Sequence, residues 1–546
     1  MIDFFKRARG HKATYNLPAM RSSKTLEPQN GFIIPAILSL MVALSIITGS
    51  VVILIDSNFS LVNRNIKSQE AFNIAEAGIN YYLWHLSHNA TDYRDGQSTP
   101  VNPDAILGYG PYTHNYMNSN ATISGTFKLY IKPQSATSSI VSVRSTGTAN
   151  GYNASRTIEA QIGAPAFSSY AIVSDSALWF GSNEEADGPV HSNQGIRMDG
   201  ASNSDITSAN ATYIPSSAIG GNGSTSHPGV WCDTSVVSPV NCSTRPKTDW
   251  RYPVPAVDFN QISGTLCTIK KLAFAADAAT SALANQANAC SQTPTTRTAA
   301  YLPQRSSSAN TSRGYLIELN NNGTYNLSTV NNENDTQSSY STALNTQSVA
   351  NNIAIPASGV IFTEDNVWVR TTSTFTGRLT IASGRLATTV ETNINIADDI
   401  VYTSKNGTDA IGLIAENSII LSPYAAPSSG NFTLEVNAAV IAQNGDVVFP
   451  SNYSFSNGTC TKGYVNPNQK LYFYGSIAVR QTWTWSWQWS SSCGNNTYDS
   501  VSGKYISGFK YNTTKYDYNL MYNPPPSFPI TSSYNTLSWR EVLVAP

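Results

Sequence analysis

The chain has 546 residues, of which 33 are basic and 34 acidic, and charged residues make up only 12% of the sequence. A near-neutral chain without a long basic stripe is poorly suited to a phosphate backbone, which excludes nucleic acid as a partner. The chain is longer than a single hydrophobic core usually accommodates, so several structural units are expected.

The amino-terminal segment, residues 1–31, is a basic leader with six Lys or Arg against two acidic residues. An uncharged run from Phe32 to Ile55 follows it, long enough as a helix to cross a hydrocarbon core of about 30 Å. By the positive-inside rule the leader stays in the cytoplasm and the rest of the chain lies outside. A secretory signal peptide is the alternative, but its apolar region is shorter and ends in a small-residue cleavage site.

The segment from Asp56 to His88 contains no Pro and keeps apolar residues at helical spacing. We therefore expect one helix over residues 32–88, about 85 Å long at 1.5 Å per residue, with bends at Pro35 and Gly49. Its exposed apolar stripe needs a partner, which is either its own head or the same helix of neighbouring subunits.

The leader, Gly31, Phe32 and the apolar helix together resemble a class III type IV prepilin signal. The segment QEAFNIAEAGINYYLWHL, residues 69–86, resembles the amino-terminal region of PilX-like minor pilins. The resemblance implies that a prepilin peptidase cuts between Gly31 and Phe32, that the new amine is methylated, and that the helix packs with other pilins. Major pilins usually have Glu at the fifth mature position, where this chain has Ala36, so the resemblance favours a minor subunit.

Three β-type runs follow the helix, namely ATISGTFKLYIKP, SIVSVRSTGTANGY and SRTIEAQIG. Their alternation and their Thr, Val and Ile content predict antiparallel strands. We expect residues 89–164 to form a small antiparallel sheet packed on the upper part of the helix, as in the pilin fold.

A weak internal repeat begins after Pro165: AIVSDSALWF, VIFTEDNVWV, LIAENSIIL and VIAQNGDVVF each join two short apolar strands through a polar turn. Such repeats without intervening helices predict a parallel β-helix over residues 165–546, with a β-sandwich as the alternative. The repeat is lost at about 201–351, which we interpret as an insertion with an Ala-rich helix and an Asn-Gly hairpin. The terminal YNPPPSFP and SWREV segments resemble large bacterial PilX-like proteins with β-helical heads. The predicted fold class is mainly β.

The six cysteines fall into three pairs that are close in sequence and lack metal-ligand spacing, which favours disulfides in an oxidising compartment. Spacing alone leaves fifteen pairings open, and buried free thiols are the alternative. The pairs are Cys232 with Cys242, Cys267 with Cys290, and Cys460 with Cys493.

The segment QTWTWSWQWSSSCG places four indoles at a spacing of two, hence on one face of a strand. They either pack against the head or form an aromatic platform for sugar rings or another surface. Burial is the interpretation we favour. The residues are Trp483, Trp485, Trp487 and Trp489.

Two groups of polar residues are candidate chemical sites. His191 follows Glu184, Glu185 and Asp187 in a turn-like segment, which would suit a metal or acid–base site, although a solvated turn explains it better. Five carboxylates lie at turn positions of the repeat and suggest a carboxylate ladder or a calcium site, although polar turns explain them equally well. They are Glu364, Asp365, Asp398, Asp399 and Glu416.

Together these features predict a minor pilin or pseudopilin-like subunit of a type IV pilus or related secretion filament, acting in pilus assembly, tip display or adhesion. Its expected partners are other pilins, the inner membrane, a prepilin peptidase and surface glycans or a host surface. We expect a single-pass cytoplasmic membrane protein whose extracytoplasmic head reaches the cell surface or pilus, with no catalytic residue, metal or cofactor. The alternatives are a membrane-anchored surface adhesin and a polysaccharide-active β-helix enzyme.

Overall fold

A computed structural model describes most of the chain, and the chain divides into two compact units, Met1–Gln69 and Glu70–Pro546. The predicted leader, Gly31, Phe32 and Cys493 lie outside the described residues, as does the side chain of Cys460. The described residues are 33–88, 92–97, 103–133, 140–151, 154–163, 165–305, 312–335, 339–425, 432–450, 455–456, 459–460, 470–489, 497–499, 503–509, 511–531 and 534–542.

The first element is the helix α1, which runs without a break over 56 residues from Ile33 to His88. The long amino-terminal helix of the predicted fold is therefore confirmed over the described residues. Pro35 lies in the first turn, where its missing N–H would have no partner within the helix. At 1.5 Å per residue α1 is about 84 Å long.

A five-stranded antiparallel sheet belongs to the second unit, with the strand order β1-β2-β3-β4-β36. Its strands are β1 (Tyr109–Met117), β2 (Ile123–Pro133), β3 (Ile140–Ala149), β4 (Ser155–Gly163) and β36 (Asn535–Val542). The three predicted β runs supply β2, β3 and β4, which confirms the small antiparallel sheet. The two outer strands were not predicted, and the second of them comes from the far end of the chain.

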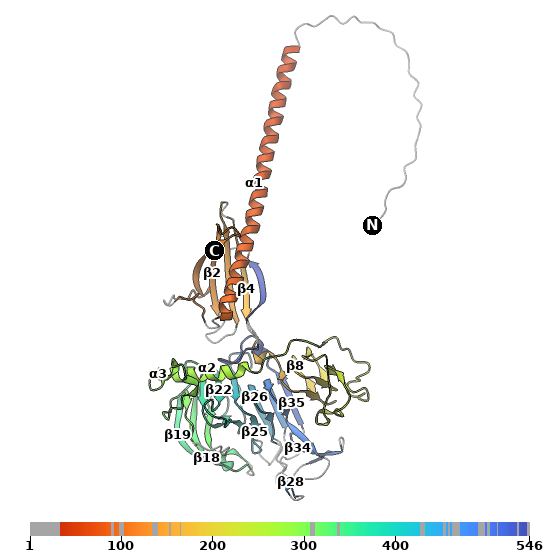
Figure 1. Ribbon diagram of the computed structural model, residues 1–546, viewed down its shortest axis with the longest axis vertical. Helices are drawn as coiled ribbons and strands as arrows, with labels where there is room; N and C mark the ends of the chain where they lie inside the picture. Colours follow the sequence, from red (N-terminus) through yellow and green to blue (C-terminus); the bar gives the residue numbers. More distant parts are fainter. Residues whose placement is uncertain are drawn as a thin grey trace, which may run out of the picture. The chain divides into compact units, whose positions relative to one another are not determined.

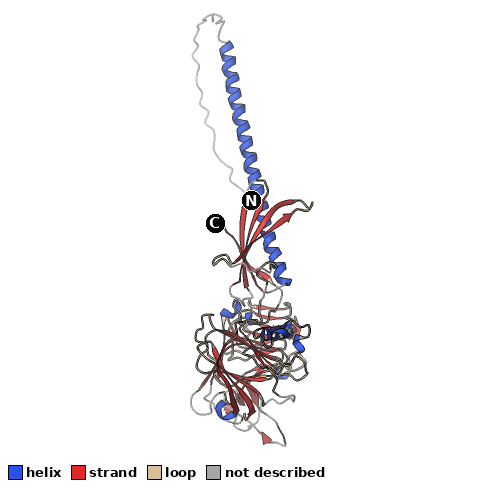
Figure 2. Cartoon of the chain, turned by 90° about the vertical axis from the view of Figure 1, so that its left-hand side faces the viewer, coloured by secondary structure: helices blue, strands red, loops and turns tan. Residues whose placement is uncertain are grey.

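The carboxyl-terminal part of α1 packs on one face of this sheet (Figure 2). There Ile74 and Tyr82 join a core with Leu129 and Val143. The contact is close because β3 has Gly147 beneath the helix. A Cβ atom on Gly147 would lie 2.2 Å from the Ala71 carbonyl oxygen and 2.4 Å from the Ala75 amide nitrogen. The backbones of helix and strand thus meet with no side chain between them.

The head is a parallel β-helix, as predicted (Figure 1). From β20 to β31, successive turns of the chain add one strand to an 11-stranded sheet and one to an eight-stranded sheet. The sequence repeats are these turns: VIFTEDNVWV forms β20 (Val360–Thr363) and β21 (Asn366–Thr371), and LIAENSIIL forms the end of β24 (Ala410–Ala415) and β25 (Ile419–Leu421). Their inward side chains are continuous apolar rows of Val, Ile and Leu that form the main core.

The order of the turns in the stack differs from their order in the chain. The last full turn contains β30 (Lys470–Val479), and the first strand of the head, β5 (Ile172–Ser174), pairs with β30 in parallel through Ile172 and Ile477. Beyond β5 the stack continues with β8 (Val190–Ser192) and β11 (Ile206–Ser208). The amino-terminal turns of the head therefore extend the carboxyl-terminal end of the β-helix.

The stretch 201–351, which we interpreted from the sequence as an insertion, supplies strands to the β-helix at both of its ends. β11 and β15 (Trp250–Arg251) prolong one end of the longer sheet, and β16 (Tyr301–Leu302) pairs with β20 at the other. The hairpin expected from Asn322 and Gly323 joins β17 (Gly314–Leu319) to β18 (Thr324–Glu333). The expected helix is α2 (Gln261–Ala275), which covers the outer face of the longer sheet.

The other strands of the two large sheets are β22 (Arg378–Ser383), β26 (Thr433–Ala442) and β35 (Tyr511–Tyr516) in the longer one, and β19 (Leu344–Ala354), β23 (Ile394–Ile396), β27 (Val447–Val448) and β31 (Trp483–Thr484) in the shorter one. One three-stranded sheet consists of β6 (Leu178–Phe180), β9 (Ile196–Met198) and β14 (Val230–Trp231), and another consists of β32 (Ser486–Trp489), β33 (Thr497–Asp499) and β34 (Lys504–Gly508). Three strand pairs form two-stranded sheets: β7 (Glu185–Ala186) with β10 (Ala201–Ser202), β12 (Thr212–Tyr213) with β13 (His227–Pro228), and β28 (Phe455–Ser456) with β29 (Thr459–Cys460). Two further α-helices are α3 (Ser281–Ala284) and α4 (Tyr340–Ala343).

The contact of α1 with β3 predicts that Gly147→Ala lowers the free energy of unfolding by about 1–3 kcal/mol, because the new methyl group forces two backbones apart. The matched control is Gly264→Ala in α2, where an added Cβ meets nothing within 4 Å. That change should raise stability by about 0.5–1 kcal/mol through helix propensity. Denaturant unfolding of the full chain in detergent measures both. Equal effects of the two changes would contradict the close contact.

Candidate functional site

The first candidate site is the apolar surface of α1 within the first unit. Among the described residues, α1 is the one helix long and apolar enough to cross a membrane. Its large apolar side chains are exposed along this part, including Ile33, Met41 and Ile53. A surface of this kind in water would be costly, so it requires lipid or protein around it.

The polar side chains of this stretch are satisfied within the helix. The Ser45 hydroxyl donates to the Val42 carbonyl at 2.8 Å, Thr48 donates to Leu44 at 2.9 Å, and Ser50 donates to Ile46 at 2.8 Å. Lipid offers no hydrogen-bond partner, so a membrane helix must pair such groups internally. The helix therefore presents no unpaired hydroxyl at these positions.

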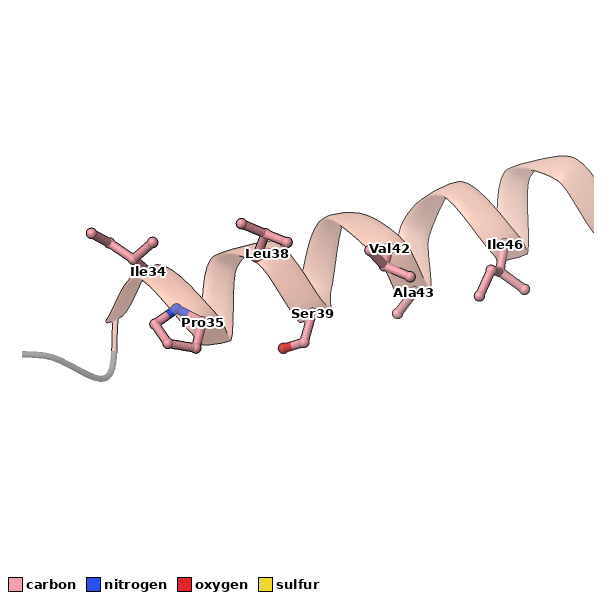
Figure 3. Close-up of a pocket in the computed structure, with 7 residues that line it drawn as sticks. All are labelled: Ile34, Pro35, Leu38, Ser39, Val42, Ala43 and Ile46. Carbon is pink, nitrogen blue, oxygen red and sulfur yellow. The ribbon is translucent and has the colours of Figure 1, made fainter.

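Two rows of side chains run along the amino-terminal end of α1, as Figure 3 shows. One row has residues four apart, Ile34, Leu38, Val42 and Ile46, and the neighbouring row has the smaller Pro35, Ser39 and Ala43. The hollow between them is lined by one helix alone, so it is an open surface and not a closed cavity. Small residues beside branched ones let a second helix approach closely.

The predicted tryptophan face does not form a single strand. Trp483 lies in β31 and Trp487 in β32, with Trp485 between the two strands. Trp485 is 4% exposed and its Nε1 donates to the Thr514 hydroxyl at 3.0 Å, while Trp483 packs on the main core. Trp487 is half-buried and donates to the Phe449 carbonyl at 2.8 Å, and the side chain of Trp489 lies outside the described residues. Trp483 and Trp485 thus belong to the interior and do not offer an open platform.

Two of the predicted cysteine pairs are disulfides in the structure, Cys232–Cys242 and Cys267–Cys290. The second joins α2 to the segment after α3, next to the buried face of the helix. The third predicted pair, Cys460 with Cys493, cannot be followed in the described side chains.

The His191 cluster is not brought together. His191 lies in β8 with 1% of its surface exposed, and its ring nitrogens bond Thr207 and Asn193, each at 3.0 Å. Burial lowers the pKa of His191. The acidic residues Glu185 and Asp187 instead face Lys515, at 3.2 Å and 3.7 Å. Within the described residues no group of three or more His, Cys, Asp or Glu is arranged to hold a metal ion.

The five repeat carboxylates fall into two places. Glu364, Asp365 and Glu416 lie buried beside Arg385, which contacts the Asp365 carboxylate at 2.8 Å and donates its amide to Glu416 at 2.7 Å. Asp398 and Asp399 lie together in another turn, where Asp398 is 3.4 Å from Arg370. Each place mixes carboxylates with cations, so neither is the row of like charges that a carboxylate ladder requires.

Sequence reasoning missed two features of the head. The first is a fully buried pair formed by Lys270 of α2 and Glu364, with 2.5 Å between Nζ and Oε1. The second is a pocket of about 300 Å³ whose lining includes Trp231, Trp250, Tyr252 and Lys247. No local motif marks either one, because the pair joins α2 to a residue far along the chain and the pocket depends on how residues 227–252 fold together.

No protein-family model and no curated protein matches this chain. Among solved structures it is similar to the crystal structure of the competence-associated pilin ComZ from Thermus thermophilus, with 12% sequence identity and a TM-score of 0.26. The match covers 87% of this chain and 97% of that chain. At this identity and score the likeness carries no conclusion about function.

The turn with Asp399 predicts a specific pH dependence. Burial raises the pKa of Asp399 to about 6, and the nearby charges of Asp398 and Glu435 act in the same direction. A raised pKa stabilises the fold at low pH, and this contribution is lost as pH rises through about 6. Asp399→Asn keeps an acceptor for the Glu435 amide, which donates at 2.8 Å, and removes the titration.

The stability of Asp399→Asn relative to the unchanged chain should therefore increase between about pH 4 and pH 7, by up to about 3 kcal/mol. Denaturant unfolding at several pH values measures this difference. The control is Asp205→Asn, which breaks an exposed contact with Arg251 in another part of the head and should not stabilise the chain at high pH. A difference independent of pH for Asp399→Asn would show that its carboxyl titrates normally.

Proposed function

We propose that this chain is a type IV pilin-like subunit, held in the cytoplasmic membrane by α1 before it assembles with other pilins through the same helix. One observation supports this most directly: a single helix combines an exposed apolar stretch of membrane length with a segment, from Ala71 to Leu86, that packs on a small antiparallel sheet. An exposed apolar helix surface can be covered by lipid in the membrane and by equivalent helices in a filament.

The finer proposal is a minor, PilX-like subunit at the tip or at occasional positions, in a pilus or a related secretion filament. Ala36 at the fifth mature position supports it, as does the size of the head inserted between β4 and β36. A head of this size is difficult to accommodate at every step of a thin filament.

A position at the tip or at occasional sites predicts that this chain is a minor component of the filament. Quantitative mass spectrometry of sheared filaments should find the chain at a small fraction of the main subunit, because its head hinders close repetition along the shaft. The control is the same ratio in the membrane fraction, which shows how much of the chain awaits assembly. Amounts similar to the main subunit in the sheared material would contradict the minor role.

Adhesion is a second proposed function, in the filament or as a permanently anchored surface protein. The aromatic pocket supports it, since the half-buried Trp250 and the exposed Tyr252 line it and a sugar ring can stack on such rings. The predicted tryptophan run contributes less, because Trp485 is buried. We propose no enzymatic activity, because Asp365 and Asp398 of the repeat are paired with Arg385 and Arg370.

Mass spectrometry of the mature amino terminus tests the pilin assignment. We expect a methylated Phe32 in chains from membrane and sheared-surface fractions, and the intact leader when the host's prepilin peptidase is deleted. Gly31→Leu should block the cut, whereas Gly10→Leu in the same leader should not. An intact Met1, or a cut elsewhere, would favour the anchored adhesin.

A further inference from the structure

Lys270 has surroundings that are unusual for a lysine. It lies on the inner face of α2 and is 0% exposed, between α2 and the outer face of the longer sheet of the β-helix. Its ammonium nitrogen lies 5.7 Å from the ring centres of both Phe274 and Phe362. Burying a lysine in apolar surroundings is costly unless its charge is paired or lost.

The nearest charged group is Glu364, which follows β20 and is 1% exposed. Lys270 Nζ lies 2.5 Å from Glu364 Oε1, yet this oxygen accepts no well-directed hydrogen bond in the described structure. The well-directed bond of Nζ goes to the Cys290 carbonyl at 2.9 Å. The amine and the carboxyl group are thus held in contact by their surroundings and not by the geometry of an ideal ion pair.

Burial favours the uncharged form of both groups. It lowers the pKa of Lys270 and raises the pKa of Glu364, in each case against the attraction of the partner. A neutral amine is a nucleophile, and a carboxylic acid is a better electrophile than a carboxylate. Tyr301 is buried near the Glu364 carboxyl group, and its hydroxyl donates to the Pro294 carbonyl at 3.3 Å. A hydroxyl in this place can stabilise negative charge that develops on oxygen.

We propose that Lys270 and Glu364 become joined by an amide bond between Nζ and Cδ, a covalent cross-link between α2 and the β-helix. The amine nitrogen attacks Cδ, the new C–N bond forms, and the C–O bond to the hydroxyl group breaks. That hydroxyl leaves with a proton from the amine as one water molecule, so no oxidant or other reactant is needed. The fixed contact between the amine and the carboxyl group supplies the proximity that favours bond formation. The exclusion of water from this site opposes hydrolysis of the amide bond.

Two other ion pairs in the same chain show what the reaction requires. Lys405 and Glu435 approach to 2.8 Å with the same functional groups, but their side chains are 38% and 32% exposed, so water keeps both charged. Arg385 and Asp365 are as buried as the proposed pair, but a guanidinium remains protonated and is not a nucleophile. Of these three pairs, Lys270 with Glu364 alone combines burial with a reactive amine.

The decisive experiment is peptide mass spectrometry of the full chain after reduction and alkylation, which removes the disulfides. We expect one cross-linked species that contains Lys270 and Glu364 and is lighter than the two separate peptides by one water. No linked peptide should contain Lys405 and Glu435, which serve as the internal control. Recovery of the Lys270 and Glu364 peptides only in unlinked form would overturn the proposal and leave a buried ion pair.

Tyr301→Phe tests how the bond forms, because it removes one hydroxyl from a buried ring. We expect the cross-linked fraction to fall while the spectroscopic signature of the fold persists. Lys270→Met should abolish the linked species altogether. An unchanged cross-linked fraction in Tyr301→Phe would show that the Tyr301 hydroxyl takes no part in the reaction. The proposal does not depend on the pilin assignment, since the leader cut and this cross-link are measured on different peptides.

Discussion

The head is inserted between two neighbouring strands of a small sheet, and much of the architecture depends on this constraint. The chain leaves β4 at Gly163 and returns in β36 at Asn535, directly beside β4. The two connections pair with each other, since the Thr531 amide donates to the Pro165 carbonyl at 2.7 Å and Phe167 donates to Pro529 at 2.9 Å. An insertion between adjacent strands must begin and end at one place, whatever fold lies between.

A β-helix wound in simple chain order has its two ends at opposite ends of the stack, which conflicts with that requirement. This chain resolves the conflict by placing its first strand, β5, against its last full turn. β30 pairs with β26 on one side, and on the other it is shared by β35, through Lys470–Gly475, and β5, through Ile477–Val479. The start and the finish of the head therefore meet on one long strand.

Several parts of this fold could be predicted from the sequence because their signals are local. The apolar run identified α1, alternation identified β2 to β4, and the repeats with polar turns identified turns of the β-helix. The outer strands β1 and β36 were missed for physical reasons: Pro111 interrupts the pattern of β1, whose register shifts between Tyr109 and Tyr112, and β36 pairs with residues more than half the chain away. The meeting of Lys270 with Glu364 likewise depends on how α2 packs, which no spacing reveals.

The place of β36 in the sheet also determines the order in which the strands of the small sheet become available for pairing. Synthesis from the amino-terminal end makes α1 and β1 to β4 first, and β36 only after the whole head. Until then the edge of β4 lacks its neighbour, and open strand edges invite pairing with other chains. Completion of the sheet that carries the helix therefore requires synthesis of the whole head, and a chain truncated within the head leaves this edge of β4 open.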